Sequence, residues 1–104
     1  MPMRPSALED RTLSIVEIGN RLREIREALL YTQTELSKRL SISLQTWNNY
    51  ERGVSRIRID EAYKVSRMTG ATLDFIYMGR ESTLPRALSE KLHHLRQLKS
   101  RNAA

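Results

Sequence analysis

The sequence predicts an all-α fold, in which a compact bundle of five helices is followed by an additional C-terminal helix. Two observations carry this prediction. Apolar residues recur at spacings of three and four over several segments, which is the period of an amphipathic helix. Side chains that cap helix N-termini precede several of these segments, and glycines follow three of them. The 104 residues are enough for one domain with a single core.

Two capping-box patterns, each a hydroxyl residue followed three positions later by glutamate, mark the starts of the first two helices. The first pattern covers residues 14–17, and an apolar stripe continues that helix to about residue 30. The second pattern covers residues 32–35 and opens a short helix that ends near Leu40.

A third helix follows almost at once. Only two residues separate the second helix from Ser43, a suitable N-cap for a helix that runs to about Arg52. Trp47 and Tyr50 form an apolar i, i+3 pair on this helix, and Gly53 supplies its stop. Two short helices joined so tightly can cross at about 90–120°, which lets the second helix lie in the DNA major groove.

Three further helices are expected. The fourth begins at Ile59 and is stopped by Gly70. The fifth starts at Thr72, is apolar on most sides and therefore largely buried, and ends at Gly79. The sixth follows a linker at residues 80–85 and carries a narrow stripe formed by Leu88, Leu92 and Leu95. That stripe is consistent both with a dimer surface and with a helix packed back on its own domain.

The pattern divides the chain into three parts. Residues 1–13, with two prolines and no sustained apolar period, are expected to form a flexible arm. Residues 14–80 form the helix-turn-helix domain. Residues 81–104 supply the linker and a basic C-terminal helix, frayed from residue 100, which is a candidate element for dimerisation or partner binding.

The charge balance favours a polyanionic partner, because 18 Lys and Arg against 12 Asp and Glu give a formal charge of +6. The lack of cysteine removes thiolate metal sites, and the adjacent His93 and His94 cannot share a helix face as ligands. We expect no metal and no cofactor. No apolar stretch could cross a bilayer and no signal peptide is evident, so a cytoplasmic protein without a membrane partner is expected.

The outer face of the third helix is rich in amides. If its apolar pair points into the core, the positions most nearly opposite are Gln45, Asn49 and Arg52, with Asn48 alongside. Amide side chains pair with adenine, and arginine pairs with guanine, in the major groove. A single exposed amide can merely solvate the surface, but three amides and an arginine together favour base reading. Leu44, in the first turn, suits either a thymine methyl group or the neighbouring helix.

Groups suited to phosphate flank this face. The helix that begins at Gln33 offers free N–H groups and a positive dipole end, and the Gln33 side chain can donate in the same direction. The N-cap Ser43 belongs to the same set of candidates. Arg52, Arg56 and Arg58 cluster around the loop after the third helix, where backbone contact is favoured over merely solvated charge.

Three segments carry a resemblance to a known family: QTELS at 33–37, SIS at 41–43 and WNNYERG at 47–53. They resemble the phage-repressor and Cro-like (XRE-type) helix-turn-helix proteins, and the similarity extends over about residues 18–79. This resemblance implies a lambda-repressor-like bundle of five helices, with base reading from the start and outer face of the third helix.

The resemblance also implies roles for individual residues. The base readers would be Leu44, Gln45 and Asn49, with Gln33 as a phosphate anchor. Similar proteins often carry an ion pair between an arginine late in the first helix and a glutamate that ends the third, which here falls on Arg26 and Glu51. We assign this pair to structure, because loss of one partner of a partly buried pair is costly.

The chain departs from the family pattern at three positions. Ser37 stands where the family usually has alanine, Ser41 where it has glycine, and Trp47 where it has valine or isoleucine. A left-handed conformation at Ser41 would cost about 1 kcal/mol relative to glycine. The bulk of Trp47 is expected to alter the angle of the recognition helix.

These features predict a sequence-specific transcriptional regulator, in particular a repressor, that places residues 44–52 in the major groove of double-stranded DNA at the nucleoid. One helix-turn-helix contacts few base pairs, so a homodimer on a twofold-related operator is expected, as the family also implies. Candidate dimer surfaces are residues 73–78 and the leucine stripe. The alternative is an antitoxin-like module that binds DNA and, through residues 81–104, a protein partner. An enzyme is not expected, because no catalytic constellation is found.

Overall fold

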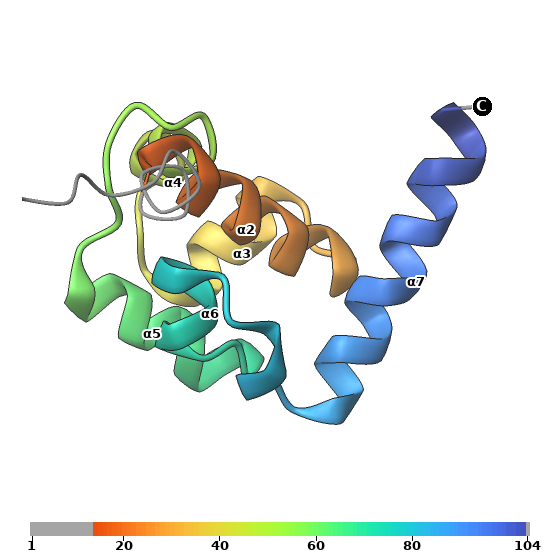
Figure 1. Ribbon diagram of the computed structural model, residues 1–104. Coiled ribbons are helices and arrows are strands. Elements are labelled where there is room, and N and C mark those ends of the chain that lie inside the picture. Colours follow the sequence, from red (N-terminus) through yellow and green to blue (C-terminus); the bar gives the residue numbers. More distant parts are fainter. Residues whose placement is uncertain (1–13, 104) are drawn as a thin grey trace, which may run out of the picture.

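The computed structural model describes residues 14–103, and this range is helical and contains no strand (Figure 1). The predicted all-α fold is confirmed. Within the described range, the α-helices are α2 (Ile15–Ala28), α3 (Gln33–Leu40), α4 (Leu44–Glu51), α5 (Ile59–Thr69), α6 (Leu73–Met78) and α7 (Arg86–Ala103), with a short 3₁₀ helix, η1, at Glu81–Thr83. The arm predicted at residues 1–13 lies outside the described residues.

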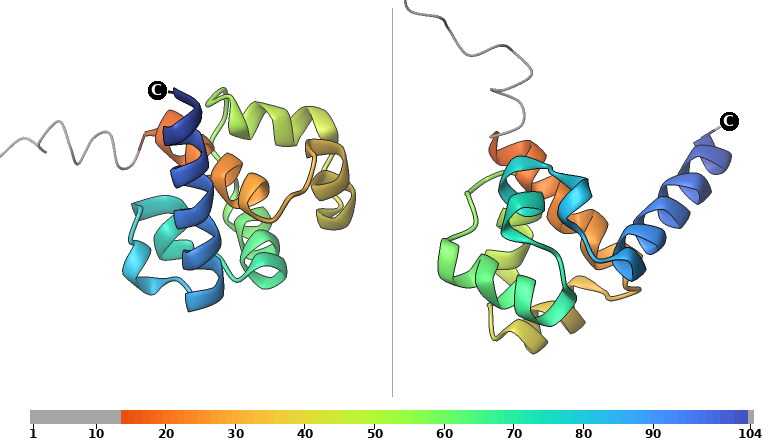
Figure 2. Two further views of the ribbon diagram at one scale, coloured as in Figure 1. Left: turned by 90° about the vertical axis from the view of Figure 1, so that its right-hand side faces the viewer. Right: turned by 60° about the horizontal axis from the view of Figure 1, so that its bottom comes forward.

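Helix α2 lies at the centre of the fold and packs against α4, α6 and α7 (Figures 1 and 2). The core that it helps to form includes Leu22, Ile25, Trp47, Phe75 and Ile76, all of which are almost completely buried. One core therefore joins the helix-turn-helix to the rest of the protein.

The crossing of α2 and α4 depends on a glycine. A Cβ atom at Gly19 would lie 2.3 Å from the carbonyl oxygen of Tyr50 and 2.8 Å from that of Glu51. Real Cβ atoms do not approach backbone oxygens so closely, so any larger residue would push the two helices apart. The sequence patterns above did not single out Gly19.

The capping residues define the helix starts. At α3 both halves of the capping box form: the Glu35 N–H donates to Thr32 Oγ1 at 3.1 Å, and the Thr32 N–H donates to Glu35 Oε1 at 2.9 Å. At α2 only half of the predicted capping box forms: the Ser14 hydroxyl accepts from the Glu17 N–H at 3.0 Å. Helix α2 ends at Ala28, two residues earlier than expected, because Leu30 adopts a left-handed conformation with φ of 64°.

The structure corrects two details of the predicted helices. The fourth helix begins at Ile59 as predicted, but this apolar residue does not enter the core: its side chain is 62% exposed, whereas Ile57 in the preceding loop is 2% exposed. The Tyr77 hydroxyl donates to the Ile57 carbonyl at 2.8 Å and so helps to hold this loop against α6. The frayed end predicted from residue 100 is instead helical, since α7 continues to Ala103.

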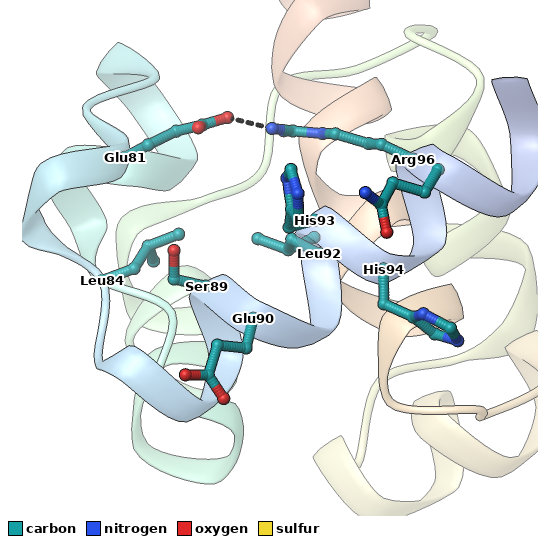
Figure 3. Close-up of a pocket in the computed structure, with 9 residues that line it drawn as sticks. Glu81, Leu84, Ser89, Glu90, Leu92, His93, His94 and Arg96 are labelled. Atoms are coloured by element: carbon teal, nitrogen blue, oxygen red, sulfur yellow. Dashed lines mark ion pairs between the residues drawn. The ribbon is translucent and has the colours of Figure 1, made fainter.

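Helix α7 packs back on its own domain, which is one of the two arrangements that its leucine stripe allowed. Leu88 and Leu92 are buried in the common core, at 4% and 2% exposure. Arg96 donates to Glu24 at 2.8 Å, which ties α7 to α2. Arg96 also pairs with Glu81 at 2.5 Å, which ties α7 to η1 (Figure 3). The later turns of α7 extend away from the bundle, and Leu98 there is 41% exposed (Figure 2).

No helix in the described range combines the length and apolar character needed to span a membrane. Among the same residues, no group of three or more histidine, cysteine or acidic side chains is placed to hold a metal ion.

Candidate nucleic-acid interface

A tight turn joins α3 to α4. Ser41 takes the left-handed conformation, with φ 56° and ψ 42°, as expected of the position that glycine usually occupies. The N–H groups of Ser41 and Ile42 donate to the end of α3, and the Ile42 side chain is buried. Ser43 then caps α4 by accepting from the Thr46 N–H at 3.1 Å. The two helices form the predicted helix-turn-helix.

The inner face of α4 is fixed by its two aromatic residues. Trp47 and Tyr50 are 0% and 4% exposed, and their rings meet edge to face with centroids 6.4 Å apart. The Tyr50 hydroxyl donates to the Glu61 carboxylate on α5. Burial, together with this hydrogen bond, raises the pKa of Tyr50 to about 12. The apolar pair therefore points inward, as the predicted orientation of α4 requires.

The outer face of α4 presents three of the predicted side chains to solvent. Gln45, Arg52 and Leu44 are exposed, and Leu44 is 47% accessible. Gln45 Nε2 donates to Oδ1 of the half-buried Asn49 at 3.0 Å, so these two amides are positioned as a unit. This bond leaves the Gln45 carbonyl oxygen as an acceptor and the Asn49 amide as a donor, the combination that the adenine edge requires.

A buried carboxylate connects α4 to the two helices before it. The Glu51 side chain is 1% exposed and accepts two bonds from Arg26 on α2, at 2.6 and 2.9 Å. It also accepts from Trp47 Nε1 at 2.5 Å and from Gln33 Nε2 on α3 at 3.0 Å. The hydrogen bonds from Arg26 to Glu51 raise the pKa of Arg26 above its ordinary value. The structure thus contains the ion pair between Arg26 and Glu51 within a wider network.

Gln33 and Asn48 contact each other at the junction of α3 and α4. Asn48 Nδ2 donates to Gln33 Oε1 at 3.2 Å, while the Gln33 amide donates to Glu51. Both side chains are half-buried. Asn48 therefore lies toward α3 and apart from the bonded pair of Gln45 and Asn49. Gln33 is the first residue of α3, where N–H groups without intrahelical partners are found.

The three predicted arginines border the C-terminal end of α4. Arg52 is the C-cap of α4, and Arg56 and Arg58 follow in the loop; all three are exposed. Arg58 lies 3.5 Å from Asp60, which the sequence patterns did not identify and which offsets part of this charge. Arg23 on α2 was also missed: its guanidinium donates to the Glu51 carbonyl at 2.9 Å, beside the same helix end. Nothing in the sequence pattern distinguished Arg23 from other surface arginines.

Comparisons with known proteins agree with this arrangement. A helix-turn-helix family model matches residues 22–76, which is more than half of the chain. One relative, named as an uncharacterized transcriptional regulator in the ATPase CF(0) region of Rhodospirillum rubrum, is 31% identical over 80 residues, covering 75% of this chain and 74% of that protein. Another, a putative HTH-type transcriptional regulatory protein of Pyrococcus furiosus, is 35% identical over 65 residues, covering 62% of this chain and 21% of that protein. No solved structure gives a significant match. The chain belongs to the XRE-type helix-turn-helix family of DNA-binding transcriptional regulators.

Proposed function

We propose that this regulator is a sequence-specific repressor, which binds a twofold-related operator as a homodimer and places α4 in the major groove. The observation that carries the proposal is the bonded pair of Gln45 and Asn49 on the outer face of α4. No carboxylate occurs between residues 41 and 50 to repel phosphate. Repression is the simplest outcome of such binding, since occupancy of a promoter blocks access to it. The site of action would be the nucleoid, within the cytoplasm.

Base reading is assigned to Gln45 and Asn49, with Leu44 suited to a thymine methyl group. Asn48 is assigned a supporting role, because its amide donates to Gln33. The bond within the Gln45 and Asn49 pair reduces the rotamer freedom that each amide would lose on binding.

Phosphate contacts are assigned to groups on both sides of this face. The N-termini of α3 and α4, at Gln33 and Ser43, direct N–H groups outward. Arg52, Arg56 and Arg58 supply cations near the opposite end of α4. Such contacts would fix the register of the protein on the duplex without reading sequence.

Part of the proposed dimer surface follows from exposure. Leu88 and Leu92 are buried within the chain, so the leucine stripe is not available unless α7 moves. On helix α6, Met78 is 39% exposed. The loop between α4 and α5, which is bonded to Tyr77 of α6 through Ile57, carries Val54, which is 57% exposed. The exposed Ile59 follows this loop. We propose that these three exposed apolar side chains, Met78, Val54 and Ile59, form the contact between two copies.

Selection of bound sites from random DNA tests the proposal. A palindromic consensus would be expected, with half-sites separated by about one helical turn. On that consensus, Gln45→Ala and Asn49→Ala should each cost about 1–3 kcal/mol of binding free energy, and clearly less on random duplexes. Gln97→Ala, on an exposed glutamine of α7, is the matched control. Equal losses on consensus and random DNA would contradict the assignment of base reading.

One observation favours the second candidate function, an antitoxin-like module with a protein partner at residues 81–104. A groove of about 520 Å³ lies between the end of α2 and α7, and its lining includes Leu30, Leu98 and Ala87. Leu30 is 89% exposed, which is unusual for a large apolar side chain. Copurification of a second protein that is lost on Leu98→Glu, together with failure to enrich any DNA sequence, would favour this function over the first.

A further inference from the structure

We propose that a basic groove between α3 and α5 binds an acidic, partly apolar segment of a partner protein. The groove is open and has a volume of about 460 Å³. Its lining consists of Arg39, Leu40, Ser41, Tyr63, Lys64, Arg67 and Met68. None of the residues assigned to DNA contact lines it, so this is a second binding function beside DNA recognition.

The charge of the groove is not neutralised from within. Three of the lining residues are cationic and none is acidic. The guanidinium of Arg39 lies 5.3 Å from the ring centroid of Tyr31, and that of Arg67 lies 5.9 Å from that of Tyr63. A tyrosine ring orients a guanidinium but leaves its net charge in place, unlike a carboxylate.

Three cations of α7 are arranged differently. Arg86, Arg96 and Lys99 each pair with a glutamate, at 2.5–3.0 Å. The carboxylates nearest in sequence to the groove residues form their hydrogen bonds or ion pairs outside the groove. Glu35 completes the capping box of α3, although it also attracts Arg39 electrostatically. Glu61 accepts from Tyr50, and Asp60 lies 3.5 Å from Arg58. The groove therefore retains positive charge for an anionic ligand.

The floor of the groove selects among anionic ligands. The accessible apolar surface of the lining comes from the half-buried Met68 and from Tyr63, which is 54% exposed, while Leu40 beneath them is 3% exposed. A DNA backbone has no apolar side chains to cover such a floor. A peptide in which carboxylates alternate with apolar side chains would satisfy both the rim and the floor, so the observations favour a protein partner over nucleic acid.

The position of the groove leaves it accessible on a DNA-bound protein. Helix α3 packs against both α4 and α5 (Figures 1 and 2). The groove lies between α3 and α5. The outer face of α4, where DNA is proposed to bind, is formed by other residues. The partner could therefore bind while α4 occupies the major groove.

Fluorescence anisotropy with a labelled peptide of alternating glutamate and leucine tests this proposal on the full chain. A peptide with glutamine in place of glutamate is the ligand control. Because two exposed ion pairs would be lost, the double variant Arg39→Gln with Arg67→Gln should weaken binding of the acidic peptide by about tenfold. The matched control, Arg86→Gln with Arg101→Gln, removes two exposed arginines outside the groove and should change binding by less than about twofold.

Three results would overturn the proposal. The acidic peptide could bind no more tightly than its glutamine counterpart, or the groove and control variants could weaken it equally. The groove variant could also weaken binding to a duplex from the selection experiment as strongly as Arg56→Ala does, which would make the groove part of the DNA footprint. If the double variant has a lowered melting temperature, Lys64→Gln, a single change at an exposed groove residue, replaces it in the peptide and duplex binding measurements. The peptide measurement does not require DNA binding, so it stays interpretable if the proposed function fails.

Discussion

Replacement of Arg26 by methionine would leave the Glu51 carboxylate buried without its main partner. The Glu51 side chain is 1% exposed, and two of its hydrogen bonds come from Arg26. Methionine keeps much of the apolar stem of arginine but removes the charge and all donors. The uncharged bonds from Trp47 and Gln33 remain, and the Arg23 guanidinium, with Nε 3.7 Å from Glu51 Oε1, is a weaker charged partner than Arg26.

The expected cost follows from the burial of this carboxylate. Removal of one partner from a buried ion pair costs about 3–5 kcal/mol, because the remaining charge stays desolvated. Arg26 itself is partly accessible, at 14% of its side chain, so water can enter and the lower end of this range applies. A loss of about 3 kcal/mol lowers the melting temperature of a domain of this size by about 12–24 °C.

Urea denaturation followed by tryptophan fluorescence measures this effect. Trp47 is the only tryptophan in the sequence and donates to Glu51, so it reports on the network itself. Glu51→Gln removes the charge with little change in shape, and a cycle with Arg26→Met isolates the coupling between the two residues. We expect the Arg26→Met change to cost less when Glu51→Gln is already present. A single-variant cost below about 1 kcal/mol, with a coupling energy near zero, would refute this reasoning.

The remaining predictions concern packing, backbone conformation and pH. Gly19→Ala should destabilise the protein by about 2–3 kcal/mol in urea denaturation, since its Cβ would meet the α4 backbone, while Ala at the exposed Asn20 should cost under about 1 kcal/mol. Ser41→Gly should raise stability by about 0.5–1 kcal/mol, because glycine adopts a φ of 56° without strain; a loss would contradict this. Burial and Glu61 raise the pKa of Tyr50 from about 10 to about 12, so between these values the folded protein keeps a proton that the unfolded chain loses. The contribution of the neutral Tyr50 to the free energy of unfolding is thus present below pH 10 and is lost as the pH rises to 12; the loss is about 1–2 kcal/mol after solvent screening. Tyr50→Phe should therefore flatten the dependence of the free energy of unfolding on pH, measured by denaturation at each pH.

Local signals were sufficient to predict most helix starts and stops. The capping box at Thr32, the N-cap at Ser43 and the left-handed glycines at 70 and 79 all form as the residue types predict. These features depend on residues within one turn of each other, so the sequence records them directly. The inward orientation of Trp47 was predicted for the same reason.

Features that depend on contact between distant segments were not predictable in this way. The pattern could not decide whether Ile57 or Ile59 would be buried, because the loop that carries Ile57 is set by its contact with Tyr77 on α6. Gly19 has no local role in α2; its requirement appears only where the α4 backbone approaches. The pair of Arg26 and Glu51 was expected from family resemblance alone, since 25 residues separate its members.

Trp47 shows how a departure from the family pattern is accommodated. Valine or isoleucine, usual at this position in similar proteins, has no side-chain donor, whereas the Trp47 indole donates to Glu51 at 2.5 Å. The same carboxylate accepts from Arg26 on α2 and Gln33 on α3, so one buried group connects three helices of the domain. Because Gln33 also accepts from Asn48, the position of α4 relative to α3 is linked to the hydrogen bonds that Glu51 forms. A substitution in this network would therefore change both the stability of the fold and the angle at which α4 presents its outer face.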